Sequence, residues 1–367
     1  MSIERIYFQI ISPERRFYHW PAYGLLCALA FVYRLGHTLH LWAYKAGVLT
    51  SRRLDCRVIS VGNLTLGGTG KTPVVMMVAD ILREQGRKPA VLSRGYKGSS
   101  SREVNIVCDG KTVLLTPEEA GDEPVMIARK LKNVPVITGP SRYQTGSYAL
   151  KHFDVDTLIL DDGFQHLALH RDVNILLFDH RRPLGNGALF PAGELREPAG
   201  ESRRADLICI TRWSETDRVP DLNGNLPTNV PVIKTVLRLD KLVDLKSGES
   251  QDAGFLQGRA VAAFCGVADP NDFRRLLDRA CARVVHYQAF PDHHAYAPAE
   301  LKAFESAALQ AGAKYILTTE KDAVKLEACS FSIPFYRVAV HLEILEGREA
   351  FSQKLLFGRD GGTRQPD

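Results

Sequence analysis

A glycine-rich segment between two apolar runs constrains the fold more than any other feature of this 367-residue chain. Residues 56–61 read as a buried strand, and residues 74–82 as a helix that continues to Gly86. Between them lies Gly62-Asn-Leu-Thr-Leu-Gly-Gly-Thr-Gly-Lys-Thr72, with Pro73 at a first-turn helix position. A strand, a glycine loop and a helix in this order predict a phosphate-binding P-loop.

The residue types in this loop suit the phosphate chain of a nucleotide. Its glycines let backbone N–H groups turn toward phosphate oxygens, and the helix N-terminus adds the positive end of its dipole. Lys71 supplies a point charge at the β- and γ-phosphates, and Thr72 offers a hydroxyl to Mg²⁺. We expect the whole loop to bind ATP, namely Thr65, Leu66, Gly67, Gly68, Thr69, Gly70, Lys71 and Thr72.

One position departs from the usual GxxxxGK[ST] pattern, because Thr65 stands where that pattern has glycine. Other nucleotide-binding classes fit less well. The loop has no GxGxxG fingerprint of a dinucleotide fold. The guanine-reading motif of GTPases is missing, its nearest equivalent being Thr319-Glu-Lys-Asp322, and Leu66 occupies the position of the signature lysine of ParA/MinD-like ATPases.

An acidic pair downstream of the loop is a candidate metal site. Residues 155–160 form a short β run that ends in Asp161-Asp162-Gly163. An acid at the end of a strand beside a P-loop is the Walker B arrangement, which holds Mg²⁺. Neighbouring side chains on a strand point oppositely, so we favour Asp162 as the residue that reaches the metal. A solvated Asp-Gly turn is the alternative.

Two further motifs leave their roles open. In Gly121-Asp122-Glu123-Pro124, which precedes a helical run to about residue 131, Asp122 is either an ordinary helix cap or a general base for an acceptor hydroxyl. The pair His293 and His294 beside an acid is more often a surface feature than a catalytic one, and no third ligand for zinc is close in sequence.

The alternation of elements predicts two α/β domains. Runs 173–178 and 205–210 read as further parallel strands, residues 215–231 as a polar linker, and residues 259–318 as a βαβαβ unit. We expect a P-loop NTPase-like parallel sheet domain at 51–230, a smaller α/β domain at 231–345, and a C-terminal tail at 346–367 that packs back on the first domain. Residues 358–367 look frayed, and the predicted site lies in the cleft between the domains.

The charge is concentrated at the N-terminus, where residues 1–60 carry the whole net charge of +5. A diffuse basic surface for nucleic acid is therefore not indicated. Residues 20–33 are free of charge and mostly apolar, too short to span a bilayer comfortably, with cations at helical spacing beyond them. We favour a membrane-associated helix in the interface within residues 1–50, while a core helix, a span and a signal peptide remain alternatives. Seven scattered cysteines favour a reducing compartment over a disulfide framework.

Taken together, the motifs resemble the tetraacyldisaccharide 4′-kinases, the lipid A 4′-kinases of Gram-negative bacteria. The resemblance follows family order over nearly the whole chain, and even Thr65 looks normal for the family. It is carried by residues 60–73, Ser93-Arg-Gly-Tyr96, Gly121-Asp-Glu-Pro124, Asp161-Asp-Gly-Phe-Gln-His166, Pro191 to Pro198, Asp292-His-His294 and Thr319-Glu-Lys-Asp322.

The resemblance implies an ATP- and Mg²⁺-dependent transfer of phosphate to the 4′-hydroxyl of a tetraacylated glucosamine disaccharide 1-phosphate, giving lipid IVA at the cytoplasmic face of the inner membrane. By carry-over, Asp122 is the catalytic base and His293 its partner, with His294 not excluded. Thr72 of the P-loop, with Asp162, Asp161 and Glu197, would form the magnesium site. Substrate or phosphate contacts would come from Asn63, Arg94, Tyr96, Arg142 and Gln165.

The expected partners are the glycolipid and a membrane surface, bound peripherally or monotopically, with neither nucleic acid nor an obligate protein partner. The alternative function is a membrane-recruited P-loop ATPase switch that has no small-molecule acceptor. A weaker option is an ATP-dependent ligase or carboxylase of small acids, in which the aromatic N-terminal segment would have no purpose.

Overall fold

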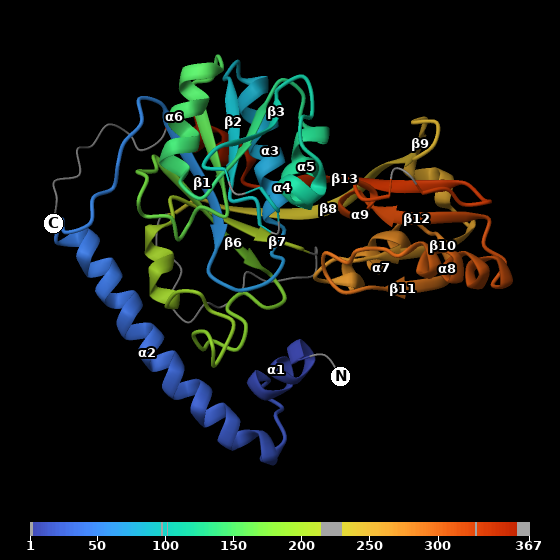
Figure 1. Ribbon diagram of the computed structural model, residues 1–367, viewed down its shortest axis with the longest axis horizontal. Helices are drawn as coiled ribbons and strands as arrows, with labels where there is room; N and C mark the ends of the chain where they lie inside the picture. The colour runs from blue at the N-terminus through green and yellow to red at the C-terminus, as the bar shows by residue number, and fades with distance from the viewer. Residues whose placement is uncertain (1–2, 97, 101, 214–229, 327–328, 358–367) are drawn as a thin grey trace. The chain divides into compact units, whose positions relative to one another are not determined.

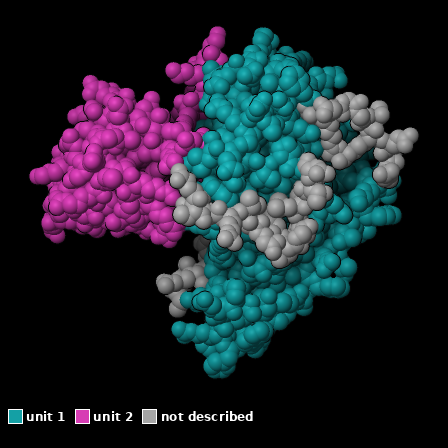
Figure 2. Space-filling model, turned by 180° about the vertical axis from the view of Figure 1, so that it is seen from behind, with its two compact units in different colours: residues 1–89, 142–236, 344–367 teal, residues 90–141, 237–343 magenta. Residues whose placement is uncertain are grey.

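The computed structural model describes residues 3–96, 98–100, 102–213, 230–326 and 329–357. The predicted linker at 215–231 and the tail beyond residue 357 lie almost entirely outside these ranges. The chain divides into two compact units (Figure 2). Unit 1 contains residues 1–89, 142–236 and 344–367, and unit 2 contains residues 90–141 and 237–343.

Unit 1 is built on parallel strands in the order β8-β7-β6-β1-β5 (Figure 1). Their cores are almost wholly buried, which matches their continuous apolar sequences. The strands are β1 (Arg57–Asn63), β5 (Thr157–Asp161), β6 (Val173–Asp179), β7 (Leu207–Thr211) and the first part of β8 (Val232–Asp244); the helices include α3 (Lys71–Glu84), α6 (Arg142–His152), the 3₁₀ helix η2 (Ala199–Arg204) and α10 (Arg348–Phe357).

The register of the central strands places the P-loop and the acidic pair at one edge of this sheet. In the β1–β5 pair, Val61 lies opposite Asp161, so both strands end at the same level. The loop after β1 and the acids at the end of β5 therefore share the carboxyl edge of the sheet, where ligands bind in open α/β folds. The C-terminal helix α10 packs on α3, and Lys354 accepts a hydrogen bond from Arg57 at 3.1 Å through its carbonyl.

Unit 2 combines a small three-strand group with an α/β group. In the first, β4 pairs parallel with β2 and antiparallel with β3. In the second, β11, β10, β12 and β13 are parallel, β9 pairs antiparallel with β8, and Phe264 lies at the centre of an aromatic core. The strands are β2 (Pro89–Ser93), β3 (Asn105–Asp109), β4 (Pro135–Thr138), β9 (Ser250–Asp252), β10 (Ala260–Cys265), β11 (Arg283–Ala289), β12 (Tyr315–Thr319) and β13 (Phe335–Glu346); the helices are α4 (Pro117–Ala120), α5 (Asp122–Lys130), η3 (Ala253–Leu256), α7 (Pro270–Arg279), α8 (Pro298–Gln310) and α9 (Glu320–Ala323).

The division into units differs from the predicted domain boundaries most at residues 90–141, and residues 231–236 and 344–345 belong to unit 1 instead of unit 2. Residues 90–141, expected in the P-loop domain, belong to unit 2. The reason is side-chain contact across a long sequence separation: α5 packs on α9, and Lys130 donates to Glu320 at 2.8 Å and to the carbonyl of Val340. No local pattern in residues 90–141 encodes these contacts.

The N-terminal segment forms α1 (Ile3–Ile11), η1 (Phe17–His19) and the long helix α2 (Trp20–Lys45), which Figure 1 shows as one unbroken element. Ala30 is the single residue of α2 that is buried, so α2 is not a core helix. The helix continues well beyond the charge-free run, because Arg34 does not interrupt helical geometry. By length and composition it could cross a membrane.

Candidate active site

The P-loop follows β1 and leads directly into α3. Gly70 is the residue that precedes the helix, with a left-handed backbone at φ 79°, and Gly67 has φ 99°. These are conformations that glycine adopts without steric cost. Lys71 and Thr72 are then the first two residues of α3, where helix N–H groups have no partner within the helix.

Thr65 fits this loop because its backbone is held by a second segment. Thr65 forms an isolated antiparallel bridge with Leu195, and the flanking bonds join Leu66 N–H to the Glu194 carbonyl at 2.6 Å and Arg196 N–H to the Leu64 carbonyl at 2.7 Å. A residue in a β bridge is extended and does not need glycine. The Pro191 to Pro198 motif thus braces the P-loop, a role that its sequence does not indicate.

Lys71 lies between two predicted site residues. Its Nζ donates to Asn63 Oδ1 at 3.1 Å and lies 3.6 Å from Asp162 Oδ1. Asp162 has a left-handed backbone at φ 53°, and both its carboxylate oxygens accept from Arg196 Nη1, at 3.0 and 2.8 Å. Burial alone would raise the pKa of Asp162, but the charges of Lys71 and Arg196 outweigh it and lower the pKa.

Other predicted residues of unit 1 have more varied surroundings. Gln165 donates to the Asn63 carbonyl at 2.9 Å, and Arg142, which is buried, donates to the Asp161 carbonyl at 3.5 Å. The Asp161 side chain is also buried. Glu197 is held by Arg204 and by His37 of α2, at 3.2 Å from Nε2 of that histidine. The structure thus brings Asp162 to Lys71, while Glu197 pairs with Arg204 and His37.

A magnesium ion fits the oxygen donors beside Lys71. Among the described residues there is no cluster of three or more His, Cys, Asp or Glu side chains that could hold a metal by itself. Mg²⁺ does not require one, since it binds through one or two carboxylates together with substrate phosphates and water. Thr72 at the start of α3 and Asp162 beside Lys71 supply a hydroxyl and a carboxylate of this kind.

A second cluster lies wholly in unit 2. Asp122 is the first residue of α5, preceded by Gly121 at φ 92°, and it caps no helical N–H. Instead its Oδ2 lies 3.0 Å from His293 Nδ1 and 3.2 Å from Lys325 Nζ. The helix-cap interpretation of Asp122 is therefore wrong. A Cβ at Gly121 would lie 2.6 Å from the Tyr96 carbonyl oxygen, so only glycine allows this approach.

The hydrogen bonds of His293 settle its tautomer. Lys321 Nζ lies 3.1 Å from His293 Nε2, and an ammonium group has only donors, so Nε2 accepts and Nδ1 carries the proton toward Asp122. His294 instead pairs with Glu300 at 3.0 Å. Burial would raise the pKa of Asp122, but the bond from His293 and the charge of Lys325 lower it overall.

Three cations at these clusters were not predicted as functional: Arg196, Lys321 and Lys325. Two of them lie inside motifs that carry the family resemblance, but their residue types alone do not assign a partner.

The remaining predicted residues of unit 2, Tyr96 and Arg94, have exposed side chains. Tyr96 is exposed with its ring centroid 6.2 Å from that of His293, and Arg94 is exposed.

A Walker-type lysine at a helix N-terminus, an acid beside it and a separate Asp–His pair define a P-loop phosphotransferase. Comparison with known proteins agrees. The model of the Tetraacyldisaccharide-1-P 4′-kinase family matches residues 22–357, and the chain belongs to this family.

Individual relatives match along most of their length. Two proteins named tetraacyldisaccharide 4′-kinase, from Syntrophus aciditrophicus and Geobacter sulfurreducens, are each 43% identical, over 82% and 88% of this chain and 84% and 90% of their own. The crystal structure of an "apo" form of LpxK from Aquifex aeolicus in complex with ATP is 33% identical, with a TM-score of 0.75 over 92% of this chain and 98% of that one.

Proposed function

We propose that this protein transfers the γ-phosphate of ATP to the 4′-hydroxyl of a tetraacylated glucosamine disaccharide 1-phosphate, producing lipid IVA for lipid A biosynthesis. The observation that carries the proposal is the family match over residues 22–357 combined with a P-loop and a separate Asp122–His293 pair. A P-loop by itself fits any nucleotide hydrolase. The pair is the additional feature that a kinase with a hydroxyl acceptor needs.

In the proposed mechanism, residues 65–72 bind the phosphate chain. The backbone N–H groups of the loop and of the first turn of α3 point to phosphate oxygens, and Lys71 neutralises charge on the transferring group. Asn63 holds the Lys71 ammonium group at 3.1 Å and so orients it. Because little covalent chemistry is required of the protein, positioning and charge stabilisation supply most of the rate.

Asp122 is the proposed general base. Its lowered pKa keeps it ionised at neutral pH, and its Oδ2 is engaged by His293 and Lys325. Within the described part of the chain, Oδ1 has no hydrogen-bond donor, which leaves it available for the proton of the substrate hydroxyl. His293 orients the carboxylate and shares the charge change as Asp122 takes that proton.

Magnesium would be held by Thr72 and Asp162, with Asp161 and Glu197 as further acids of the site. When bound, Mg²⁺ supplies positive charge to the β- and γ-phosphates. Asn63, Arg94, Tyr96, Arg142 and Gln165 are the proposed contacts to substrate or phosphate.

The proposed location is the cytoplasmic face of the inner membrane of a Gram-negative bacterium. Helix α2 has a row of exposed apolar residues, among them Leu25, Val32 and Leu39, each more than 60% exposed. The same helix contacts the segment 191–198 that braces the P-loop (the P-loop brace), since the Tyr33 hydroxyl donates to the Arg196 carbonyl at 2.7 Å. A membrane-bound α2 would therefore hold the P-loop near its lipid substrate.

Transfer of a radiolabelled γ-phosphate tests this function. With lipid, ATP and Mg²⁺ present, label should appear on the glycolipid. An ATPase switch, the competing function, would release only inorganic phosphate whatever the detergent. A chain without α2 that remains fully active on a small soluble acid would favour the ligase alternative.

A further inference from the structure

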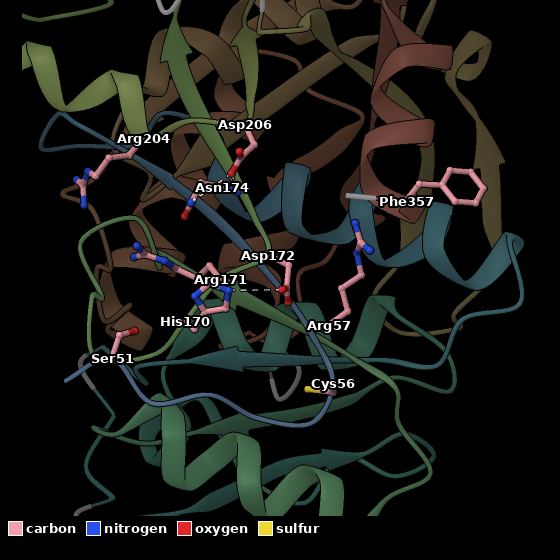
Figure 3. Close-up of a pocket in the computed structure, with 10 residues that line it drawn as sticks. All are labelled: Ser51, Cys56, Arg57, His170, Arg171, Asp172, Asn174, Arg204, Asp206 and Phe357. Carbon is pink, nitrogen blue, oxygen red and sulfur yellow. Dashed lines mark hydrogen bonds and ion pairs between the residues drawn. The ribbon is translucent and has the colours of Figure 1, made fainter. Parts of the chain in front are cut away.

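Unit 1 contains a cavity of about 650 Å³ at the edge of the sheet opposite to the P-loop (Figure 3). Its lining comes from the starts of strands: Arg57 begins β1, Arg171 and Asn174 flank the start of β6, and Asp206 precedes β7. The P-loop follows the other end of β1, and Asp162 follows the same end of the neighbouring strand β5. The cavity is therefore separate from the nucleotide site.

Arg171 in this cavity is a half-buried cation whose hydrogen-bond partners are all neutral carbonyl groups. Its Nη1 donates to the carbonyls of Gly163, Phe164 and His166, at 3.4, 3.2 and 3.0 Å. It makes no ion pair with any described carboxylate, and its Nε is buried without a partner. Burial and the nearby Arg204 charge lower the pKa of Arg171 to about 10, although the charges of Glu197 and Asp206 act in the opposite direction. Such a group is stabilised by an anion.

The side-chain oxygen of the neighbouring Asn174 is a buried acceptor that a ligand with a hydrogen-bond donor would satisfy. Its side chain is buried, with the residue 9% exposed. Its Nδ2 faces the Asp206 carboxylate at 3.4 Å, which fixes the amide orientation, and its Oδ1 has no partner. Figure 3 shows the Arg171 and Asn174 side chains extending to the same side of the view. A ligand here needs anionic oxygens and an O–H group.

The acids of the lining compensate Arg171 only in part, because they also accept hydrogen bonds from other groups. Asp172 accepts from the Val58 N–H at 2.7 Å and lies 3.6 Å from His170, and Asp206 accepts from the Asn174 N–H at 3.0 Å. Arg204 is compensated by Glu197 and Glu201. Arg57 brings one more cation, with its Nε buried and unpartnered.

We propose that this cavity binds a hydrogen phosphate ion or a phosphate monoester in its singly protonated form, whose oxygens accept from Arg171 and whose P–O–H donates to Asn174 Oδ1. A phosphodiester and sulfate carry the negative oxygens but no such proton at neutral pH. The volume of the cavity is many times the volume that one water molecule occupies in the liquid, so the cavity has room for an organic group on the phosphate.

Calorimetric titration of the full chain in detergent tests the proposal, with the P-loop first filled by a non-hydrolysable ATP analogue. Inorganic phosphate and glycerol phosphate should bind at one site, with sulfate at least about tenfold weaker. Asn174→Leu should remove the difference in affinity between phosphate and sulfate. Arg171→Lys should weaken the binding of all three ligands. Asn271→Leu, at an exposed position of unit 2, is the matched control.

Binding of inorganic phosphate alone would identify the free ion, and binding of glycerol phosphate an organic monoester; either supports the site. Phosphate binding that vanishes when the P-loop is filled would overturn it. Equal affinity for phosphate and sulfate in the unchanged chain would do the same. Melting curves of each variant show that it is folded, and Asn174→Leu keeps the test valid if the Arg171 variant does not fold.

Discussion

Asp162 and His293 share an unusual backbone conformation, with φ of 53° and 62°. Residues other than glycine pay about 1–2 kcal/mol for left-handed geometry, and such strain persists where surrounding contacts determine it. Here the contacts are polar: Asp162 forms ion pairs with Lys71 and Arg196, and His293 forms hydrogen bonds with Asp122 and Lys321. Both residues are therefore held by partners from distant segments.

Replacing Asp122 with Asn should lower kcat for the lipid substrate by about 10²–10⁴-fold, the usual contribution of a general base. The change keeps the shape of the side chain and removes its proton affinity. Glu300→Gln is the matched control, because it alters the acid that pairs with the other histidine, and it should leave kcat unchanged. Normal turnover by the Asp122 variant would remove Asp122 from the mechanism.

Asp162→Asn should raise the Mg²⁺ concentration needed for half-maximal activity and lower kcat. The amide keeps a side chain that tolerates φ 53° but is a poorer ligand for a hard cation. Rate measured against Mg²⁺ concentration checks this, and chelation by EDTA should abolish transfer in the unchanged enzyme. An unaltered Mg²⁺ dependence in the variant would contradict a metal role for Asp162.

The pH dependence of stability follows from the same carboxylates. Asp122 and Asp162 have pKa values below the ordinary 3.8 in the folded state. A carboxyl group whose pKa is lower in the folded state than in the unfolded chain stabilises the fold fully at a pH above its unfolded pKa. That stabilisation is lost as the pH falls through its folded pKa. The melting temperature should therefore fall as the pH drops below about 4. It should fall less steeply in the double variant Asp122→Asn and Asp162→Asn.

At the scale of elements, α2 combines an apolar surface with specific contacts to the P-loop brace. Tyr33 and His37 contact Arg196 and Glu197, the two neighbouring residues whose side chains pair with Asp162 and with Arg204. Leu25, Val32 and Leu39 on the rest of α2 are each more than 60% exposed. A membrane surface would cover them.

Changing Leu25, Val32 and Leu39 to Ser should reduce pelleting of the protein with membranes, because each exposed leucine or valine loses about 1.5–3 kcal/mol of possible burial. Leu114 and Leu309 of unit 2, also exposed, provide the control when changed to Ser. Equal pelleting of both variants in sedimentation assays would argue against α2 as the anchor. Neutralising Arg15, Arg16 and Arg34 in low salt tests the separate electrostatic part.

At the scale of the whole molecule, the chain passes between the two units within β8 and β13 and again at residues 89–90 and 141–142. The proposed base and its histidine belong to unit 2, and the P-loop belongs to unit 1. Each set is organised by its own packing. Residues 90–141 carry Asp122 into unit 2 through α5 and its contact with α9.

Lys130→Met should destabilise this part of unit 2 by about 1–3 kcal/mol, since it leaves the buried Glu320 carboxylate without its Lys130 donor. Hydrogen exchange should then accelerate in both α5 and α9. Lys132→Met, an exposed lysine on the same segment, should change neither. Faster exchange confined to α5 would indicate that the two helices are not coupled.

Local patterns in the sequence were enough to predict the P-loop, the helix that follows it, the buried strands β1, β5, β6 and β7, and the short list of candidate acids. Each depends on neighbours a few residues away: glycine at positive φ, apolar runs and strand-end carboxylates. The partner of Asp122, the bracing of Thr65 by Leu195, the grouping of residues 90–141 and the cations Arg196, Lys321 and Lys325 were decided only by tertiary structure. Those contacts join segments up to 210 residues apart, as in the bond from Lys130 to the Val340 carbonyl, and no local periodicity records them.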